Sequence, residues 1–247
     1  METYTDIEVR YEDKVAHIII NRPDKLNAIR IKTYRELISA LQEADDSPDC
    51  HLMVLEGSGG QFTAGNDLAD LVGADKQQVM DGVQGIFNCV AGLKKVVIGV
   101  VEGVAVGIGT TLLLHCDLVI ASSKTRFRLP FANLGVCPEG GSSVLLPQAI
   151  GQKMAREVLL TGRFFSAEEA LRWGLINSVF ETGQAAEAAQ QYIVQLLRQP
   201  LDSLIATKKL MRASMADVEE VVRNELLVFG ELLEKDETRQ RIAGLLK

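Results

Sequence analysis

The chain has 247 residues, of which 47% are hydrophobic and 24% are charged, a composition typical of a folded globular protein and not of a disordered one. Its formal net charge of −7 argues against a nucleic-acid-binding protein, which needs a basic face to displace counterions from phosphates. The four cysteines form no Cys-x-x-Cys pair, which predicts free thiols in a reducing compartment. The polar N-terminus and the lack of a long apolar run predict a cytoplasmic protein without membrane contact.

Predicted strands and helices alternate along the first part of the chain. Two strands are predicted within residues 7–21, around a turn at 12–14, because the run at 15–20 is dense in β-branched residues. Apolar residues at helical spacing predict a helix over 31–44. Further strands are predicted at 52–56, 96–101 and 118–121, with a helix over 107–115. This alternation predicts an α/β fold with buried sheets.

The pattern changes after Gly151. From there the sequence predicts nearly continuous helix, including helices over 201–212 and 217–234. Pro200 interrupts this helical part, since proline cannot continue a helix from its interior. We therefore place a boundary there, between a core at 1–199 and a C-terminal helical region at 200–247.

Two glycine-rich segments, 57–68 (GSGGQFTAGNDL) and 102–111 (EGVAVGIGTT), each follow a predicted strand and run toward a helix start. This arrangement can leave backbone N–H groups unpaired at the positive end of a helix dipole, where they bind negative charge. Glycines that only make tight turns are the alternative. Neither segment is a phosphate-binding P-loop, because no Gly-Lys-Ser/Thr follows, and the second segment also lacks the dinucleotide-binding spacing.

Seven motifs, in order over about residues 7–180, resemble the enoyl-CoA hydratase/isomerase (crotonase) superfamily. They are NRPDKLNA at 21–28, FTAGNDL at 62–68, VEGVAVG at 101–107, CDLVIAS at 116–122, LGVCPEGG at 134–141, LTG at 160–162 and AEEALRWGL at 167–175. The resemblance implies a crotonase-like spiral of ββα units, with C-terminal helices that build a homotrimer or hexamer. It also implies an acyl-CoA thioester as the substrate, with no separate cofactor and no metal.

The resemblance implies an oxyanion hole made by the backbone N–H groups of Ala64 and Ile108. Both would donate to the thioester oxygen as it gains negative charge, and such preorganised donors contribute roughly 2.7–4 kcal/mol each. Arg22 and Lys25 are expected beside the CoA phosphates, although an ordinary solvated turn would carry the same charges. The substrate-binding residues expected in full are Arg22, Lys25, Ala28, Ala64, Gly65, Asn66, Asp67, Leu68, Gly107, Ile108, Thr111, Phe131 and Leu134. Asp67 is expected to cap a helix or orient its loop.

Hydratases of the superfamily carry two glutamates, and this chain has Thr111 and Phe131 at those positions. Adding water to a double bond needs one group that deprotonates the water and another that protonates the α-carbon. Efficient hydration is therefore not expected. The segment Pro138-Glu139-Gly140 instead resembles Δ3,Δ2-enoyl-CoA isomerases, in which one glutamate moves a proton from C2 to C4 of a 3-enoyl-CoA through a dienolate.

A 1,3-proton shift needs one base only, so Glu139 alone is the predicted acid and base. Apolar neighbours such as Phe131, Leu134 and Val136 predict that its pKa lies above the usual value of about 4.3. A surface glutamate near a helix start is the alternative for Glu139. For the function, the alternatives are another crotonase reaction (hydration or thioester hydrolysis, with Asp67 or water assisting) and a non-catalytic acyl-CoA-binding protein. A late helix at 226–233 is expected to close the acyl pocket, from this chain or a neighbouring subunit.

Overall fold

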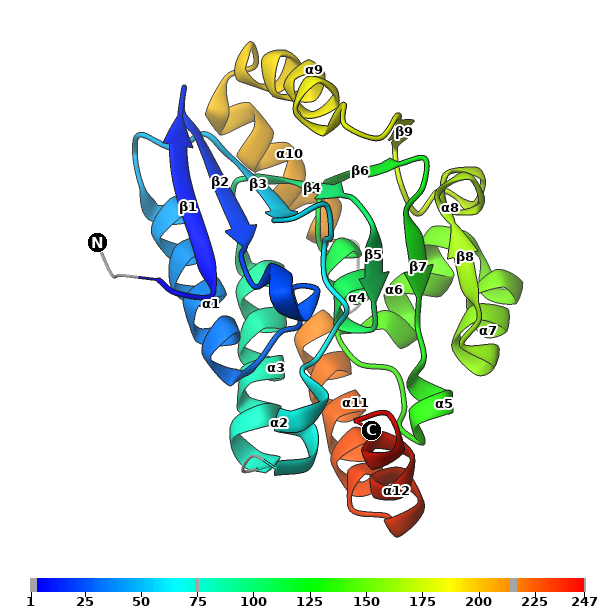
Figure 1. Ribbon diagram of the computed structural model, residues 1–247. Helices are drawn as coiled ribbons and strands as arrows, with labels where there is room; N and C mark the ends of the chain where they lie inside the picture. The colour runs from blue at the N-terminus through cyan, green and yellow to red at the C-terminus, as the bar shows by residue number, and fades with distance from the viewer. Residues whose placement is uncertain (1–3, 74–75, 214–216, 247) are drawn as a thin grey trace.

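Two β-sheets form the centre of the protein, which the computed structural model describes over residues 4–73, 76–213 and 217–246 (Figure 1). In this described part the larger sheet has the strand order β1-β2-β3-β4-β6-β9. Its strands are β1 (Ile7–Glu12), β2 (Val15–Ile20), β3 (Leu52–Gly57), β4 (Val96–Val101), β6 (Leu118–Ser122) and β9 (Ser178–Phe180). Only the β1–β2 pair in it is antiparallel. The smaller sheet contains β5 (Val104–Val106), β7 (Arg126–Arg128) and β8 (Phe164–Ser166).

Helices cover both faces of the larger sheet and continue along the C-terminal part (Figure 1). They are α1 (Ile31–Asp46), α2 (Leu68–Gly73), α3 (Lys76–Gly92), α4 (Ile108–Leu113), α5 (Phe131–Leu134), α6 (Ser142–Ile150), α7 (Gln152–Thr161), α8 (Ala167–Trp173), α9 (Ala185–Leu197), α10 (Leu201–Ala213), α11 (Val218–Leu233) and α12 (Asp236–Gly244). A short 3₁₀ helix, η1, spans Pro23–Lys25. Within the described residues no helix combines the length and apolar character needed to cross a bilayer.

The larger sheet is apolar on both faces because helices pack against each of them. Side chains alternate between the faces of a strand, so Ile18 of β2 faces the core that contains α1 and α3. Val54 of β3 and Ile98 of β4 face the opposite way, toward Ile193 of α9. Parallel sheets are usually covered on both sides in this manner, and their strands are then continuously hydrophobic. The dense apolar runs in the sequence are therefore explained by two-sided burial.

The predicted elements from residue 7 to residue 121 are confirmed, with boundaries shifted by a few residues. The prediction of nearly continuous helix after Gly151 is wrong, because β8 and β9 interrupt it and β9 pairs in parallel with β6. Both strands have three residues, which is too short to show a period of two. The helices predicted over 201–212 and 217–234 are confirmed as α10 and α11.

Helix α3 is absent from the predicted elements, although it packs against both α1 and α11. Its glycines lower the helix propensity of the sequence. Two of them permit the close approach to α1, since a Cβ at Gly82 would lie 2.9 Å from the ring of Tyr34 and one at Gly85 would lie 3.1 Å from Ile38. The glycines that weaken the helical pattern in the sequence therefore also allow α3 to pack closely against α1.

The C-terminal helices lie against the core. Helix α10 begins directly after Pro200, where the sequence predicts a boundary, and α11 packs against α3 and α6. Helix α12 contacts α2 and α5, so the end of the chain lies beside elements from its first half and its middle (Figure 1). The division into a core at 1–199 and a helical region at 200–247 stays a prediction.

Candidate active site

The two glycine-rich segments lie side by side. The Phe62 N–H donates to the Glu102 carbonyl at 2.8 Å, and the Val106 N–H donates to the Thr63 carbonyl at 3.1 Å. Gly65 has a φ of +95°, and a Cβ there would lie 2.7 Å from the Val106 carbonyl oxygen. Only glycine suits both the backbone conformation and the contact. This pairing holds the first loop against the start of α4.

In the part of the first loop that lies against the second, the described residues leave the Asn66 N–H free, whereas the N–H groups of its neighbours Gly65 and Asp67 are occupied. The Ala64 N–H donates to the Leu26 carbonyl at 2.9 Å, and the Asp67 N–H donates to the Ile29 carbonyl at 2.8 Å. The Asn66 N–H has no acceptor within the described residues. The Ala64 N–H, the predicted oxyanion donor of this loop, is therefore already engaged by the turn that precedes Ile29, and the identity of the donor stays a prediction.

The second loop leaves the N–H of Ile108 free. Ile108 is the first residue of α4, and the first N–H groups of a helix have no partner within the helix. The preceding N–H, of Gly107, donates to the Arg128 carbonyl at 2.9 Å, and that of Thr110, two residues after Ile108, donates to the Gly107 carbonyl at 2.9 Å. In the described part of the chain Ile108 has no such partner. The left-handed φ of +55° at Gly107 makes the sharp entry to α4 possible.

Both free N–H groups belong to residues that line one cavity of about 410 Å³. The predicted residues that line it are Ala64, Gly65, Asn66, Leu68, Gly107, Ile108, Phe131 and Leu134. Phe229 and Leu233 of α11 and Ile242 of α12 complete the apolar wall. Helix α11 of this chain therefore lines the cavity, and its predicted role in closing an acyl pocket stays a prediction.

Arg22 lies outside the cavity wall and is paired inside the protein. Its Nη2 lies 3.2 Å from Asp67 Oδ2, and its guanidinium also donates to the Ala28 carbonyl. Asp67 Oδ1 accepts the N–H of Ala69 at 3.2 Å, so this carboxylate orients the loop and caps the start of α2, as predicted. Lys25 is exposed at the end of η1. The contacts of Arg22 and Lys25 with CoA phosphates stay predictions.

Glu139 lies behind the cavity wall, and it is only 1% exposed. Its Oε1 accepts the hydroxyl of Thr111 at 2.6 Å, whereas Oε2 has no partner among the described residues. Thr111 follows Ile108 by three residues on α4, so Glu139 lies about one helical turn from the cavity. Thr111 was expected to touch substrate, but it is fully buried and contacts Glu139 instead.

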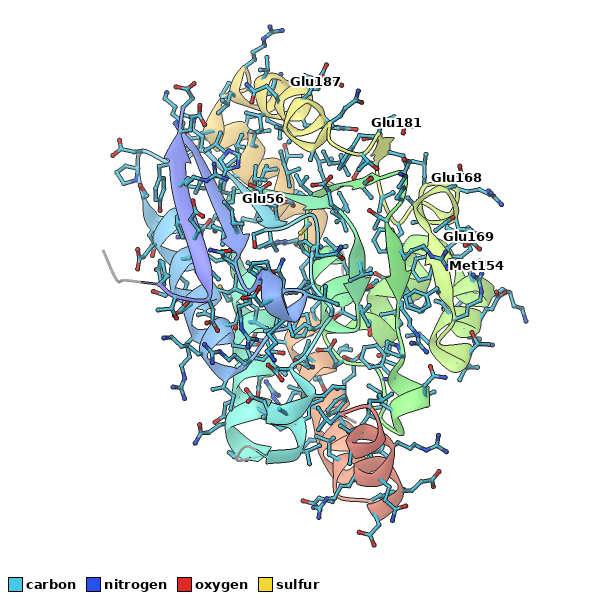
Figure 2. The ribbon with its side chains drawn as sticks, viewed as in Figure 1. Glu56, Met154, Glu168, Glu169, Glu181 and Glu187 are labelled. Carbon is cyan, nitrogen blue, oxygen red and sulfur yellow. The ribbon has the colours of Figure 1, made fainter. Side chains whose placement is uncertain are left out.

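Burial raises the pKa of Glu139 to about 8, against the effect of the Thr111 hydrogen bond and with a contribution from the Glu225 carboxylate. The predicted upward shift in pKa is therefore confirmed. Glu168, Glu181 and Glu187, by contrast, are exposed. Figure 2 shows these three by α8, β9 and α9, away from the C-terminal helices that close the cavity.

The backbone around Glu139 is fixed by residues that the sequence does not point to. Glu225 of α11 accepts the N–H groups of Gly141 at 2.7 Å and Ser143 at 2.9 Å, and so caps α6. The His115 Nε2–H donates to the Gly140 carbonyl at 2.8 Å. Burial lowers the pKa of His115 to about 4, so the ring is neutral near pH 7. No sequence signal connects Glu225 to Glu139, because 86 positions separate them.

A family model described as enoyl-CoA hydratase/isomerase matches residues 10–246. The chain belongs to the enoyl-CoA hydratase/isomerase family. Its fold agrees, since the crystal structure of an enoyl-CoA hydratase/isomerase from Pseudoalteromonas atlantica superposes with a TM-score of 0.90 at 32% identity, over 98% of this chain and 97% of that one. The crotonase-like α/β fold implied by the sequence motifs is thus confirmed.

Relatives in the enoyl-CoA hydratase/isomerase family carry the names of both reactions. The short-chain-enoyl-CoA hydratase of Clostridium acetobutylicum is 29% identical over 247 residues, which cover 96% of this chain and 92% of the relative. The peroxisomal enoyl-CoA delta isomerase 3 of Mus musculus is 36% identical over 182 residues, which cover 71% of this chain and 57% of the relative. The choice between the two reactions therefore depends on the residues of this site.

Proposed function

We propose that this enzyme converts a 3-enoyl-CoA into the 2-enoyl-CoA, with Glu139 as the single acid and base. The observation that carries the proposal is the Glu139 carboxyl group, which is 1% exposed and has one oxygen without a partner among the described residues. Such a group, with a pKa near 8, is basic enough to accept a carbon-bound proton and acidic enough to return it.

The reaction balances with this one side chain. Glu139 Oε2 takes a proton from C2, the C2–H electrons form the C1–C2 double bond of a dienolate, and the thioester oxygen gains negative charge. The Oε2–H then protonates C4 as the thioester carbonyl reforms, which leaves the double bond between C2 and C3. No water is consumed, and Glu139 ends in its starting state.

Asn66 and Ile108 are the proposed oxyanion donors. Their N–H groups have no other partner in the described chain and belong to two residues of the same cavity. Preorganised donors of this kind stabilise a developing oxyanion by roughly 2.7–4 kcal/mol per donor. Both come from the main chain, so the isoleucine side chain does not prevent donation by Ile108.

Hydration is disfavoured by the residues at the positions of the two hydratase glutamates. It requires a group that activates water and a second that protonates carbon. Thr111 and Phe131, at the positions of the two hydratase glutamates, are 0% and 4% exposed and contribute no carboxylate. The burial of Glu139 keeps bulk water from its side chain as well. These features support isomerisation over hydration.

The decisive experiment supplies trans-3-hexenoyl-CoA to the purified protein in D₂O and follows products and label. We expect the 2-enoyl ester without 3-hydroxyacyl-CoA, and a loss of about 10²–10⁴-fold in kcat for Glu139→Gln. Glu187→Gln, which changes an exposed glutamate, is the matched control and should behave as wild type. Formation of 3-hydroxyacyl-CoA or free CoA thiol would favour hydration or hydrolysis, and binding of the ester without turnover would favour a non-catalytic protein.

The assembly stays a prediction as well. We propose a homotrimer or hexamer, supported by two exposed apolar side chains of α11, Leu227 at 63% and Val228 at 48%. Light scattering coupled to size exclusion measures the mass directly. A monomer at micromolar concentration would contradict this proposal without affecting the proposed reaction.

A further inference from the structure

We infer that Thr111 is a positioning residue that anchors Oε1 of Glu139 and thereby assigns the proton transfer to Oε2. The inference depends on the proposed function, since it presupposes that Glu139 is the base. Thr111 lies on α4 with no exposed surface, and its side chain contacts Glu139 and not the cavity. It stands at the position of a hydratase glutamate, but here it serves a different carboxylate.

The Thr111 hydroxyl has one proton and two neighbouring acceptors. Oε1 of Glu139 lies at 2.6 Å and the carbonyl oxygen of Ile108 at 3.3 Å. A hydroxyl donates to an ionised carboxylate more strongly and at a shorter distance than to a neutral carbonyl. The proton therefore points to Oε1. With Thr111 as the donor to Oε1, the lone pairs of Oε2 are left free to take a proton.

The anchor also acts after proton transfer. When Oε2 carries the substrate proton, Oε1 becomes the carbonyl oxygen of the neutral acid and still accepts the Thr111 hydroxyl. The carboxyl group then cannot turn and exchange its two oxygens without breaking this bond. The proton stays on the oxygen that received it, which is what its return to C4 requires.

Among the described residues, the other ionisable groups near Glu139 cannot replace Thr111 as the hydrogen-bond donor to its carboxyl group. Glu225 of α11 is an acceptor when ionised and already binds two backbone N–H groups. The Tyr34 hydroxyl on α1 donates to Asn66 Oδ1, and the Cys137 thiol donates to the Glu225 carbonyl at 3.4 Å. Burial, with a contribution from Glu139, raises the pKa of both groups, so both stay neutral. The neutral His115 ring binds the carbonyl of Gly140. Within the described residues, Thr111 is thus the only hydrogen-bond donor to this carboxyl group.

The test compares Thr111→Val, which keeps the side-chain shape and removes the hydroxyl, with Thr111→Ser, which keeps the hydroxyl. The pH dependence of kcat/KM reports ionisation of the free enzyme. We expect Thr111→Val to move the midpoint upward by about one pH unit or more, because a hydrogen bond to the charged form is lost, and to lower kcat/KM near pH 7 by about tenfold or more. Thr111→Ser should restore the wild-type midpoint.

An infrared measurement gives a readout that does not need turnover. The carboxyl C=O stretch of protonated Glu139, identified by its absence from Glu139→Gln, should rise in frequency in Thr111→Val, because Oε1 no longer accepts a hydrogen bond. Far-ultraviolet circular dichroism and thermal unfolding report whether each variant is folded. An unshifted band in a folded Thr111→Val protein would overturn the inference.

The outcomes also separate this inference from the proposed function. Wild-type turnover in Glu139→Gln would remove the base itself, and with it both proposals. An inactive Glu139→Gln together with a Thr111→Val variant whose pH midpoint is unchanged would overturn only the role of Thr111. A Thr111→Ser variant that behaves as Thr111→Val would likewise show that the hydroxyl is not what matters.

Discussion

The two sides of the candidate site are built from different parts of the polypeptide. The proposed oxyanion side uses backbone N–H groups of Asn66 and Ile108, held by hydrogen bonds between neighbouring main chains. The base side uses the carboxyl group of Glu139, which the Thr111 side chain of α4 holds, while the Glu225 side chain of α11 holds the backbone that follows it. The first side should therefore tolerate changes of side chain but not of backbone conformation, whereas the second should respond to the loss of single side-chain atoms.

The largest effect in this comparison is expected from Gly65→Ala. The new Cβ would lie 2.7 Å from the Val106 carbonyl at a left-handed φ of +95°, so the loop must move and carry the Asn66 N–H with it. Loss of one oxyanion donor predicts a fall in kcat of about 10²–10³-fold. Gly60→Ala is the matched control, because Gly60 is also left-handed but a Cβ there meets nothing within 4 Å. Equal activities for the two variants would contradict the oxyanion assignment.

A smaller effect, on the base side, is expected from Glu225→Gln. The variant removes a negative charge that raises the pKa of Glu139, so the midpoint of the kcat/KM profile should move downward, opposite to Thr111→Val. It also replaces one of the two acceptor oxygens for Gly141 and Ser143 by an NH₂ group. Chemical denaturation should show a loss of about 1–3 kcal/mol in the free energy of unfolding. An upward or absent shift in the midpoint would separate Glu225 from the titration of Glu139.

The stability of the protein should fall with rising pH through the titration of Glu139. The folded-state pKa of about 8 lies above the unfolded value near 4.5, so the folded state binds the extra proton and its stabilising effect is lost as pH rises toward 8. His115 has the opposite sign, since its depressed pKa of about 4 makes stability rise with pH up to about 6.5. The difference in unfolding free energy between wild type and Glu139→Gln isolates the glutamate, and it should fall steadily as pH rises from about 4.5 to about 8 and level off above that. A constant difference would mean that the pKa of Glu139 is not raised.

The smallest effect is expected from Asn66→Ala. The Asn66 side-chain oxygen accepts the hydroxyl of Tyr34, but the proposed donor is the backbone N–H, which alanine retains. The change in kcat should therefore stay below about tenfold, well short of the loss of an oxyanion donor. A loss of kcat as large as that of Gly65→Ala would show that the Asn66 side chain takes part directly. The oxyanion side would then depend on a side chain, as the base side does.

The sequence predicted the base side of the site more closely than the oxyanion side. Glu139 stands out because the motif around it is local, and the apolar residues near it in the chain predict its raised pKa. The oxyanion donor proposed from the structure lies two residues from the one expected from the sequence, since Ala64 and Asn66 belong to the same motif and differ in which N–H is occupied. That occupancy depends on Leu26, which lies nearly forty positions away and whose carbonyl direction has no signature in the sequence.

The sequence by itself determined the family, most strands and helices up to residue 121 (but not α2, α3 or β5), the glycine-rich loops and the identity of the proposed base. These features depend on periodicity and on residues within one motif, where chain geometry fixes the neighbours. Tertiary structure alone decided that Thr111 and Glu225 meet the Glu139 segment and that Phe229, Leu233 and Ile242 close the cavity. Burial and hydrogen bonding between distant segments set the pKa and orientation of a side chain, and these contacts exist only once the chain has folded.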